Sequence, residues 1–134
     1  MEFLSDIYHK RIVDTHTEVR ETYNKLGMML SVLDTRLSEI YHSIEKTDDR
    51  ELDAIAYTSQ LKSVLTRRRV VKDEMARLKP FASMAKQALN EIEVRYEGAM
   101  KKSFEIRQQL NVTMTLDDVM TEMGVEPLKV STRS

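Results

Sequence analysis

Two acidic residues stand three positions before a histidine in the first half of the chain. Asp6 precedes His9 in this way, and Glu39 precedes His42. On a helix this spacing places a carboxylate and an imidazole on one side, as in the di-iron sites of ferritin-like bundles. The two pairs would lie about 50 Å apart on a single helix, so one chain cannot assemble such a site. We therefore predict no metal, and expect a hydrogen-bonded His42 near a turn.

His9 and His16 are seven residues apart. Imidazoles at this spacing face the same way on a helix, and they could form a pH switch or a metal site together with those of a partner chain. Polar residues at such positions also set the register and the number of helices in a coiled coil. The second interpretation is the one that we favour.

Basic side chains are concentrated between residues 67 and 79. A nucleic-acid site would use the following residues: Arg67, Arg69, Lys72, Arg77 and Lys79. On a helix, Arg67 and Lys72 flank the apolar side while Arg69 points away, so the charges fan around the helix. Phosphate binding is thus the alternative, and solvated helix flanks are the simpler interpretation.

A seven-residue apolar repeat indicates the elements that carry these residues. Its positions in the first third of the chain are Ile12, His16, Val19, Tyr23, Leu26, Leu30, Leu33, Leu37, Ile40 and Ile44. The second run is Tyr57, Leu61, Val64, Arg68, Val71, Met75 and Leu78. Repeats of this kind predict long helices that pack on one another through these seams.

A short polar break between the seams predicts an antiparallel hairpin. The first helix would run from about Ser5 or Asp6 to Lys46, and Asp48 with Glu51 reads as a capping box that opens the second. For a turn centred near residue 47, the numbers of facing residues add to about 94. This register pairs Leu33 with Leu61.

Arg68 is the charged residue in the second seam. At the predicted register it lies opposite Leu26 and Gly27. A guanidinium there either pairs with an acid of a neighbouring chain or extends through the space beside the glycine. We favour the ion pair with another chain.

The seam continues past Pro80 to Leu110 in unchanged register. Pro80 either kinks one continuous helix or begins a separate third helix. We favour the kinked helix, because no turn-forming residue precedes the proline. At the predicted register, the first helix would cover the second helix only as far as about residue 90. The seam beyond that point would be uncovered and would need a partner. The contact candidates on it are Ile92, Tyr96, Ile106 and Leu110.

The last quarter of the chain predicts a short helix over about residues 115–123. Thr115 and Asp118 form a second capping box, and Gly124 is a Schellman-type stop. Met120 and Met123 on this helix are further contact candidates, because methionine adapts to irregular surfaces. We expect one region over residues 1–110, and a second over 111–134 that ends in a polar tail, Lys129 to Ser134.

Composition narrows the class of protein. The 134 residues carry a net charge of −1, with 32% charged residues, 6% aromatic residues and no cysteine. This is typical of long-helix proteins, and no nucleophile motif, cofactor loop or membrane segment is evident. We predict an all-α, non-enzymatic protein without a cofactor, located in the cytoplasm and not at a membrane.

Three short segments carry a resemblance. They are Tyr41-His42-Ser43-Ile44-Glu45, then Leu61-Lys62, then Arg67-Arg68-Arg69-Val70-Val71-Lys72-Asp73-Glu74. Over residues 30–80 the chain resembles small helical hypothetical proteins of bacteriophages and prophages. The resemblance implies a phage-like source, in the host cytoplasm or the virion, and a non-catalytic accessory role.

Together these features predict a long helical hairpin that acts as an interaction or assembly module. Its partners would be itself, as a homo-oligomer, and another protein: a virion component or an inhibited host factor. The remaining contact candidates are Arg67, Arg68, Arg69 and Lys72. A nucleic-acid-binding accessory protein is the alternative.

Overall fold

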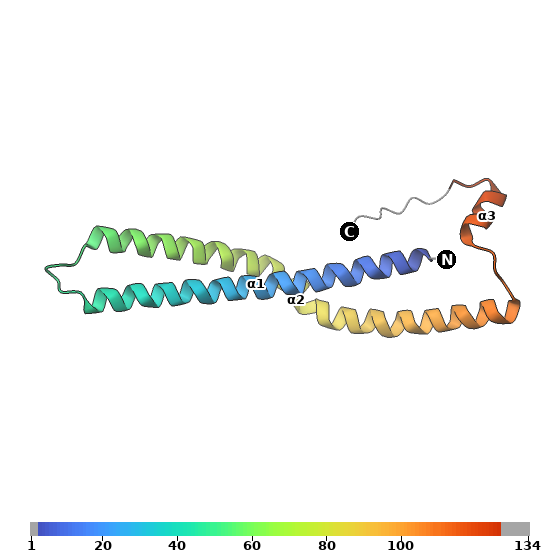
Figure 1. The fold of residues 1–134 in the computed structure, drawn as a ribbon, viewed down its shortest axis with the longest axis horizontal. Coiled ribbons are helices and arrows are strands. Elements are labelled where there is room, and N and C mark those ends of the chain that lie inside the picture. The colour runs from blue at the N-terminus through green and yellow to red at the C-terminus, as the bar shows by residue number, and fades with distance from the viewer. Residues whose placement is uncertain (1–2, 127–134) are drawn as a thin grey trace. The chain divides into compact units, whose positions relative to one another are not determined.

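The computed structural model describes residues 3–126 as three α-helices. They are α1 (Leu4–Lys46), α2 (Ala54–Leu110) and α3 (Leu116–Met123) (Figure 1). No strand occurs among these residues. The predicted all-α fold, with two long helices packed together and a short third helix, is confirmed.

The chain forms two compact units. The hairpin unit is Thr17–Ala85, and the terminal unit combines Met1–His16 with Lys86–Ser134. Both boundaries fall inside long helices, so each unit contains a segment of α1 and a segment of α2. The predicted separation of residues 111–134 from the rest stays a prediction, and the predicted polar tail lies outside the described residues.

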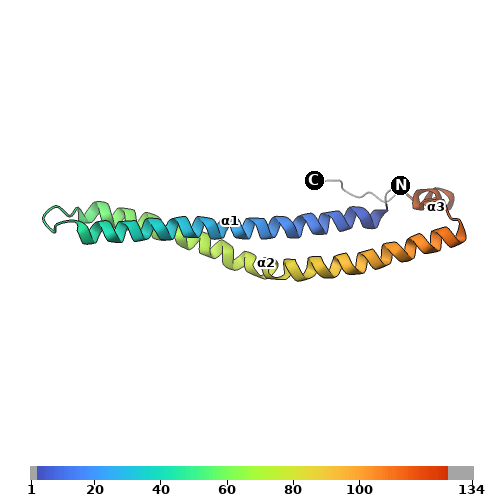
Figure 2. The ribbon, with the colours of Figure 1, turned by 60° about the horizontal axis from the view of Figure 1, so that its bottom comes forward.

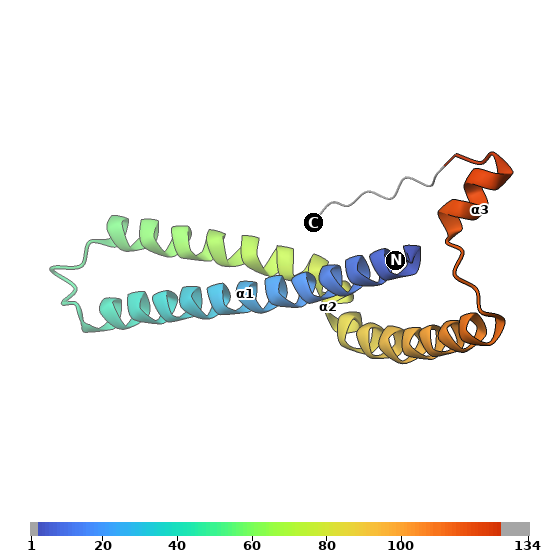
Figure 3. The same ribbon diagram turned by 45° about the vertical axis from the view of Figure 1, so that its right-hand side comes forward.

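The predicted seams form the interior of the hairpin unit. The segments of α1 and α2 run side by side and antiparallel from the turn that joins them (Figures 1, 2 and 3). Leu33, Val64 and Val71 are buried and in one cluster. The partly buried residues packed against this cluster are Leu26, Leu30, Leu37, Ile40 and Met75. A two-helix hairpin buries only a narrow seam, and most seam side chains keep some exposure.

The turn of the hairpin is longer than the sequence pattern predicts. The second helix begins at Ala54, and the carboxylate of Asp53 accepts the N–H of Ala56 at 3.0 Å. The predicted capping box at Asp48 is wrong. The Asp48 side chain instead accepts the N–H of Arg50 at 3.3 Å, and its carbonyl accepts the N–H of Glu51 at 2.8 Å, which forms a tight turn.

This longer turn changes which residues face one another. Asp34 contacts Arg68, and Gly27 faces the methyl group of Met75. The numbers of facing residues therefore add to about 102 (34 with 68, 27 with 75). The predicted sum of about 94 is wrong by roughly one heptad, and so are the pairing of Leu33 with Leu61 and the placement of Arg68 opposite Gly27.

Pro80 lies inside α2, which continues through it. The interpretation of one continuous helix is confirmed. Proline has no N–H to donate to the preceding turn, so one hydrogen bond of the helix is missing there. On the following turn, the Ser83 hydroxyl donates to the Pro80 carbonyl at 3.2 Å. Seam residues on both sides of the proline are partly buried or buried, as at Leu78 and Ala85, so packing keeps the helix intact.

In the terminal unit, the start of α1 packs against the second half of α2. His9 contacts Glu93, and these numbers also add to 102. The α2 helix ends at Leu110, and the next residue, Asn111, has a left-handed backbone (φ 51°). The Val112 N–H returns to the Arg107 carbonyl at 3.0 Å.

The predicted caps of α3 are confirmed. The Thr115 hydroxyl accepts the Asp118 N–H at 3.2 Å, and the Asp118 carboxylate accepts the Thr115 N–H at 2.9 Å. Gly124 ends the helix with a φ of 71°, and the Val125 N–H bonds to the Met120 carbonyl at 2.9 Å. These are the bonds of a Schellman stop.

Candidate interaction site

An apolar groove lies on one face of the hairpin unit. Its volume is about 690 Å³. It is lined by residues of both helices: Met29, Val32, Leu33, Arg36, Thr66, Arg67, Val70 and Val71. We call this concavity the apolar groove.

Exposed apolar side chains in the apolar groove lie directly beside the buried core. Val32 is 52% exposed and Val70 is 64% exposed, whereas Leu33 and Val71 next to them are 6% and 7% exposed. Met29 is also exposed. Contiguous apolar surface of this kind is typical of a contact site for another helix or protein. The sequence signal was present, since these residues occupy positions that flank the seam.

A second groove continues from the apolar groove toward the turn. The two share Arg36. The second groove has a volume of about 560 Å³ and is lined by Arg36, Glu39, Ile40, Ser43, Ser59, Gln60, Ser63 and Val64. We call it the serine groove, because Ser43, Ser59 and Ser63 provide its small side chains. Small residues between two helices leave room for side chains from outside.

Tyr57 is a further residue at the turn end of the hairpin. Its hydroxyl lies 2.8 Å from the Ser43 hydroxyl and 3.3 Å from that of Thr47. The hydrogen bond with Ser43, and then that with Thr47, lowers the pKa of Tyr57 below its usual value. These bonds tie the last turn of α1 to the first turns of α2.

Arg68 pairs with an acid of its own chain. Its Nε lies 2.5 Å from Asp34 Oδ1, with the Arg68 side chain 30% exposed and that of Asp34 48% exposed. The one-heptad change in register brings Asp34 to this position. The need for an acid from another chain is therefore removed, and the space beside Gly27 is taken by Met75.

The other predicted basic residues separate onto two faces of the hairpin unit. Arg67 lies in the apolar groove, where its guanidinium bonds to the Ser63 carbonyl at 3.1 Å. Arg69 and Lys72 lie in a different concavity of about 710 Å³. We call it the basic groove; its lining is Thr58, Leu61, Lys62, Leu65, Thr66, Arg68, Arg69 and Lys72. No carboxylate is among these lining residues.

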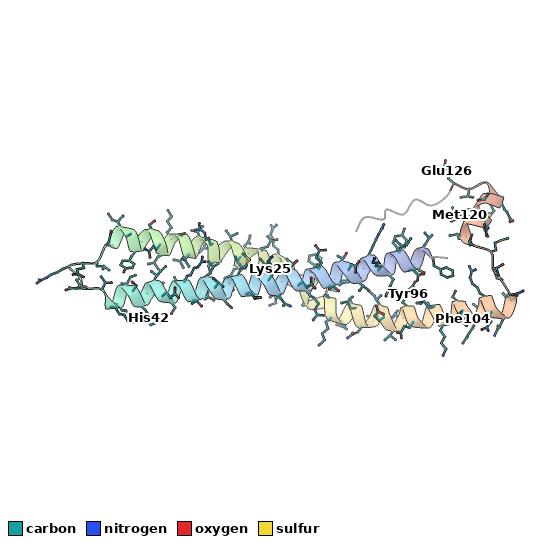
Figure 4. All side chains as sticks on the ribbon, in the orientation of Figure 1. Lys25, His42, Tyr96, Phe104, Met120 and Glu126 are labelled. Carbon is teal, nitrogen blue, oxygen red and sulfur yellow. The ribbon has the colours of Figure 1, made fainter. Side chains whose placement is uncertain are left out.

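Polar contacts in the terminal unit converge on Tyr96. The Tyr96 ring stacks on the His9 ring, with centroids 4.5 Å apart, and the His9 Nε2 lies 2.8 Å from Glu93. The Tyr96 hydroxyl donates to Asp6 and lies 3.0 Å from the Ser5 hydroxyl. Tyr96 points from α2 toward α1 (Figure 4).

Tyr96 holds its proton firmly. Burial raises the pKa of Tyr96, and the hydrogen bond to the Asp6 carboxylate raises it further. A general base or a nucleophile needs a lowered tyrosine pKa. These contacts are suited to joining the start of α1 to α2.

The uncovered seam predicted beyond residue 90 is only partly present. Ile92 and Tyr96 are partly buried, because the register brings the start of α1 alongside them, and their prediction as uncovered is wrong. Ile106 and Leu110, further along α2, are exposed. On α3, Met120 is buried and Met123 is exposed.

Beyond Tyr96, a groove of about 680 Å³ lies between the start of α1 and α2. Its lining is Phe3, Ser5, Asp6, Tyr96, Ala99, Met100, Ser103, Phe104 and Arg107. The Arg107 guanidinium lies 5.0 Å from the Phe3 ring centroid and donates to the Met114 carbonyl at 2.9 Å. Through Arg107, these contacts link the residue before α1 (Phe3) and the segment before α3 (Met114) to the same turn of α2.

The histidines do not gather into a metal site. Within residues 3–126 there is no cluster of three or more histidine, cysteine or acidic residues that could hold a metal ion. His42 is exposed and its Nδ1 lies 3.8 Å from the Glu45 carboxylate. His9 faces Glu93, whereas the predicted sum of about 94 would place it opposite Ala85.

No protein-family model, curated protein sequence or solved structure matches the chain. In the described part of the chain, none of the helices has an apolar stretch of the length that crossing a membrane requires.

Proposed function

We propose that the chain is a non-enzymatic helical interaction module that acts through protein contacts made by the hairpin unit. The observation that carries the proposal is the apolar groove, where Met29, Val32 and Val70 are exposed beside the core residues Leu33 and Val71. Two helices alone cannot cover these side chains. A further helix laid in the groove would remove them from water, which is the main source of stability in helical bundles.

The resemblance over residues 30–80 supports a phage or mobile-element source for this module. The resembling segments include Val70 and Val71, which lie in the apolar groove. The role that we propose is assembly, either within a virion or on a host factor. The partner is another copy of the chain, another protein, or both.

Substitution of Val70 by aspartate tests the proposal. Val70→Asp places a charge in the apolar groove, where it must lose its hydration when a partner covers it, and Arg36 and Arg67 in the same groove offset only part of that cost. We expect Val70→Asp to weaken association at least tenfold while helix content, measured by circular dichroism, stays the same. Association is measured by sedimentation of the purified chain and by co-purification from the cells that make it.

Leu65→Asp is the matched control. Leu65 is an exposed apolar residue of the same helix, and it lines the basic groove instead. We expect it to leave association unchanged. If Val70→Asp and Leu65→Asp have equal effects, or if the wild-type chain associates with nothing in either assay, the proposal is wrong.

A nucleic-acid-binding role is a second candidate, and the basic groove is the observation that favours it. Lys62, Arg69 and Lys72 gather there. Filter binding of duplex DNA over a series of salt concentrations tests it, because contacts with phosphates give a steep fall of affinity with salt. Arg69→Ala with Lys72→Ala should reduce that slope by about 2. If the affinity for duplex DNA changes neither with the salt concentration nor with these substitutions, the role is excluded.

A further inference from the structure

We propose that two copies of the hairpin unit pair face to face and antiparallel, about a twofold axis that passes Val32 and Val70. This inference rests on the proposed function and names its partner as a second copy of this chain. It follows from three features of the described residues: the charge order along α1, the side-chain sizes along α2, and the register between the two helices.

The charge order along one side of α1 is complementary to itself. The exposed residues spaced seven apart through Val32 are Glu18, Lys25, Val32, Glu39 and Lys46. Residues seven apart lie on the same side of a helix. When a second α1 runs antiparallel across Val32, Lys25 of each copy meets Glu39 of the other. Glu18 and Lys46 meet in the same way, so that the axis generates two copies of each ion pair.

The corresponding point on α2 is Val70. Facing residues of the hairpin add to about 102, which places Val70 level with Val32. Both side chains are exposed and line the apolar groove. The same axis can therefore pass both valines, and α2 crosses its own copy antiparallel at Val70.

Large exposed side chains on α2 then meet small ones. Phe81 and Met84 are 63% and 64% exposed. At eleven and fourteen residues beyond Val70, they face Ser59 and Ala56 of the other copy. Ser59 lies in the serine groove, so Phe81 has a concavity to enter. Nearer the axis, Arg67 lies level with Asp73 and Glu74 of the other copy, which adds a further pair of opposite charges.

A parallel arrangement of the two copies is less favourable. A twofold axis along the hairpin would lay α1 of one copy over α2 of the other at the same level. Lys25 would then face Arg77, and Glu18 would face the apolar Met84. Like charges in contact oppose association. An apolar side chain that faces a charged one does not gain the free energy of apolar burial, and the charge loses hydration. The antiparallel arrangement has opposite charges at both Lys25 and Arg67.

An exchange of charges tests this register. Lys25→Glu places two glutamates together at each of two points, and Glu39→Lys places two lysines together there. We expect each single variant to weaken the dimer at least about tenfold in sedimentation equilibrium at low salt. The double variant, Lys25→Glu with Glu39→Lys, restores opposite charges and should return to within about threefold of the wild-type affinity. Circular dichroism checks that each variant is helical.

A single cysteine tests the position of the axis. The chain has no cysteine, so Val32→Cys introduces one thiol per copy. On the axis, the two thiols lie within disulfide reach, and mild oxidation should give a covalent dimer in high yield. Leu65→Cys, exposed on the basic groove, is the control and should remain largely monomeric on denaturing gels.

The inference is overturned if the wild-type chain is a monomer at about 100 μM, a concentration at which specific dimers are populated. It is also overturned if the charge-exchanged double variant fails to recover, or if Leu65→Cys cross-links as well as Val32→Cys. In each of these cases the proposed function would still stand if Val70→Asp lost its binding to another protein. The proposed function depends on the apolar groove, whereas the pairing of two copies depends on the charge order.

Discussion

At the scale of single residues, Arg68 shows how a charge is accommodated in an apolar seam. Its guanidinium reaches the edge of the seam and pairs with Asp34, which is about half exposed. Ion pairs at this exposure contribute about 0 to 1 kcal/mol to the free energy of unfolding. The aliphatic part of the side chain covers the neighbouring seam, as long basic side chains do.

Arg68→Leu should therefore stabilise the hairpin unit. Leucine at this position gains roughly 1 to 2 kcal/mol from apolar burial between Val64 and Val71, while Asp34 remains partly hydrated after losing its partner. We expect a net gain of about 1 kcal/mol in the free energy of unfolding, measured by urea denaturation, with the oligomeric state unchanged.

Asp34→Asn is the comparison for this prediction. It removes the charge from the ion pair and leaves Arg68 in the seam, and we expect it to cost no more than about 1 kcal/mol. A clear loss of stability in Arg68→Leu would show that the ion pair matters more to the hairpin unit than the apolar contact does.

At the scale of elements, the caps decide where helices begin and end. Asp48 and Asp53 both precede segments with helical composition, but the helix opens at Asp53. Asp48 is used in the turn itself, through its bond to the N–H of Arg50. The choice between two acidic caps a few residues apart sets the length of the turn, and the turn sets which seam residues meet.

The capping box of α3 makes a pH-dependent prediction. The Thr115 backbone N–H, and then the Thr115 side chain, holds the pKa of Asp118 below its usual value. A lowered carboxyl pKa means that the contribution to stability is present above the ordinary pKa near 3.8 and is lost as the pH falls through the lowered pKa. Hydrogen exchange of the Val119 and Met120 amides should accelerate in that acidic range, relative to the intrinsic rate.

Thr115→Ala should remove part of this protection already at neutral pH. The loss of an N-cap costs about 1 kcal/mol, so we expect exchange of these amides to be roughly fivefold faster. Thr113→Ala, at an exposed position outside the cap, is the control. If the two variants show equal exchange rates, the capping box does not stabilise α3.

At the scale of the whole molecule, the register joins α1 to α2 in both compact units. In the hairpin unit it places Asp34 beside Arg68, and in the terminal unit it places His9 beside Glu93. Because the turn is longer than predicted, α1 reaches Tyr96 and covers part of the seam that the shorter turn would leave bare. Exposed apolar side chains nevertheless remain, among them those of the apolar groove and Ile106 and Leu110.

Paired cysteines can measure this register. Leu30→Cys with Val71→Cys places thiols at facing seam positions of one cluster, and we expect an intramolecular disulfide on oxidation at low protein concentration. Leu33→Cys with Leu61→Cys should fail to close, because the residue facing Leu33 is eight positions from Leu61, about 12 Å along the helix. The reverse result would support the shorter turn.

The sequence by itself determined the helices, the seams and the caps of α3, because each depends on residues close together in the chain. The repeat predicted that Leu33, Val64 and Val71 turn inward. Thr115 and Gly124 marked the two ends of α3. Arg67 and Arg69 were also predicted to point in different directions, and they line different grooves.

Only the tertiary structure decided the register, and with it the partners of Arg68, His9 and Tyr96. A seven-residue repeat cannot choose between registers one heptad apart, since apolar residues meet apolar residues in both. The choice depends on the turn and on polar pairs across the helices, such as Asp34 with Arg68, which are distant in the chain. The apolar groove depends on the same choice, because Val32 lies level with Val70 only in the register that the structure adopts.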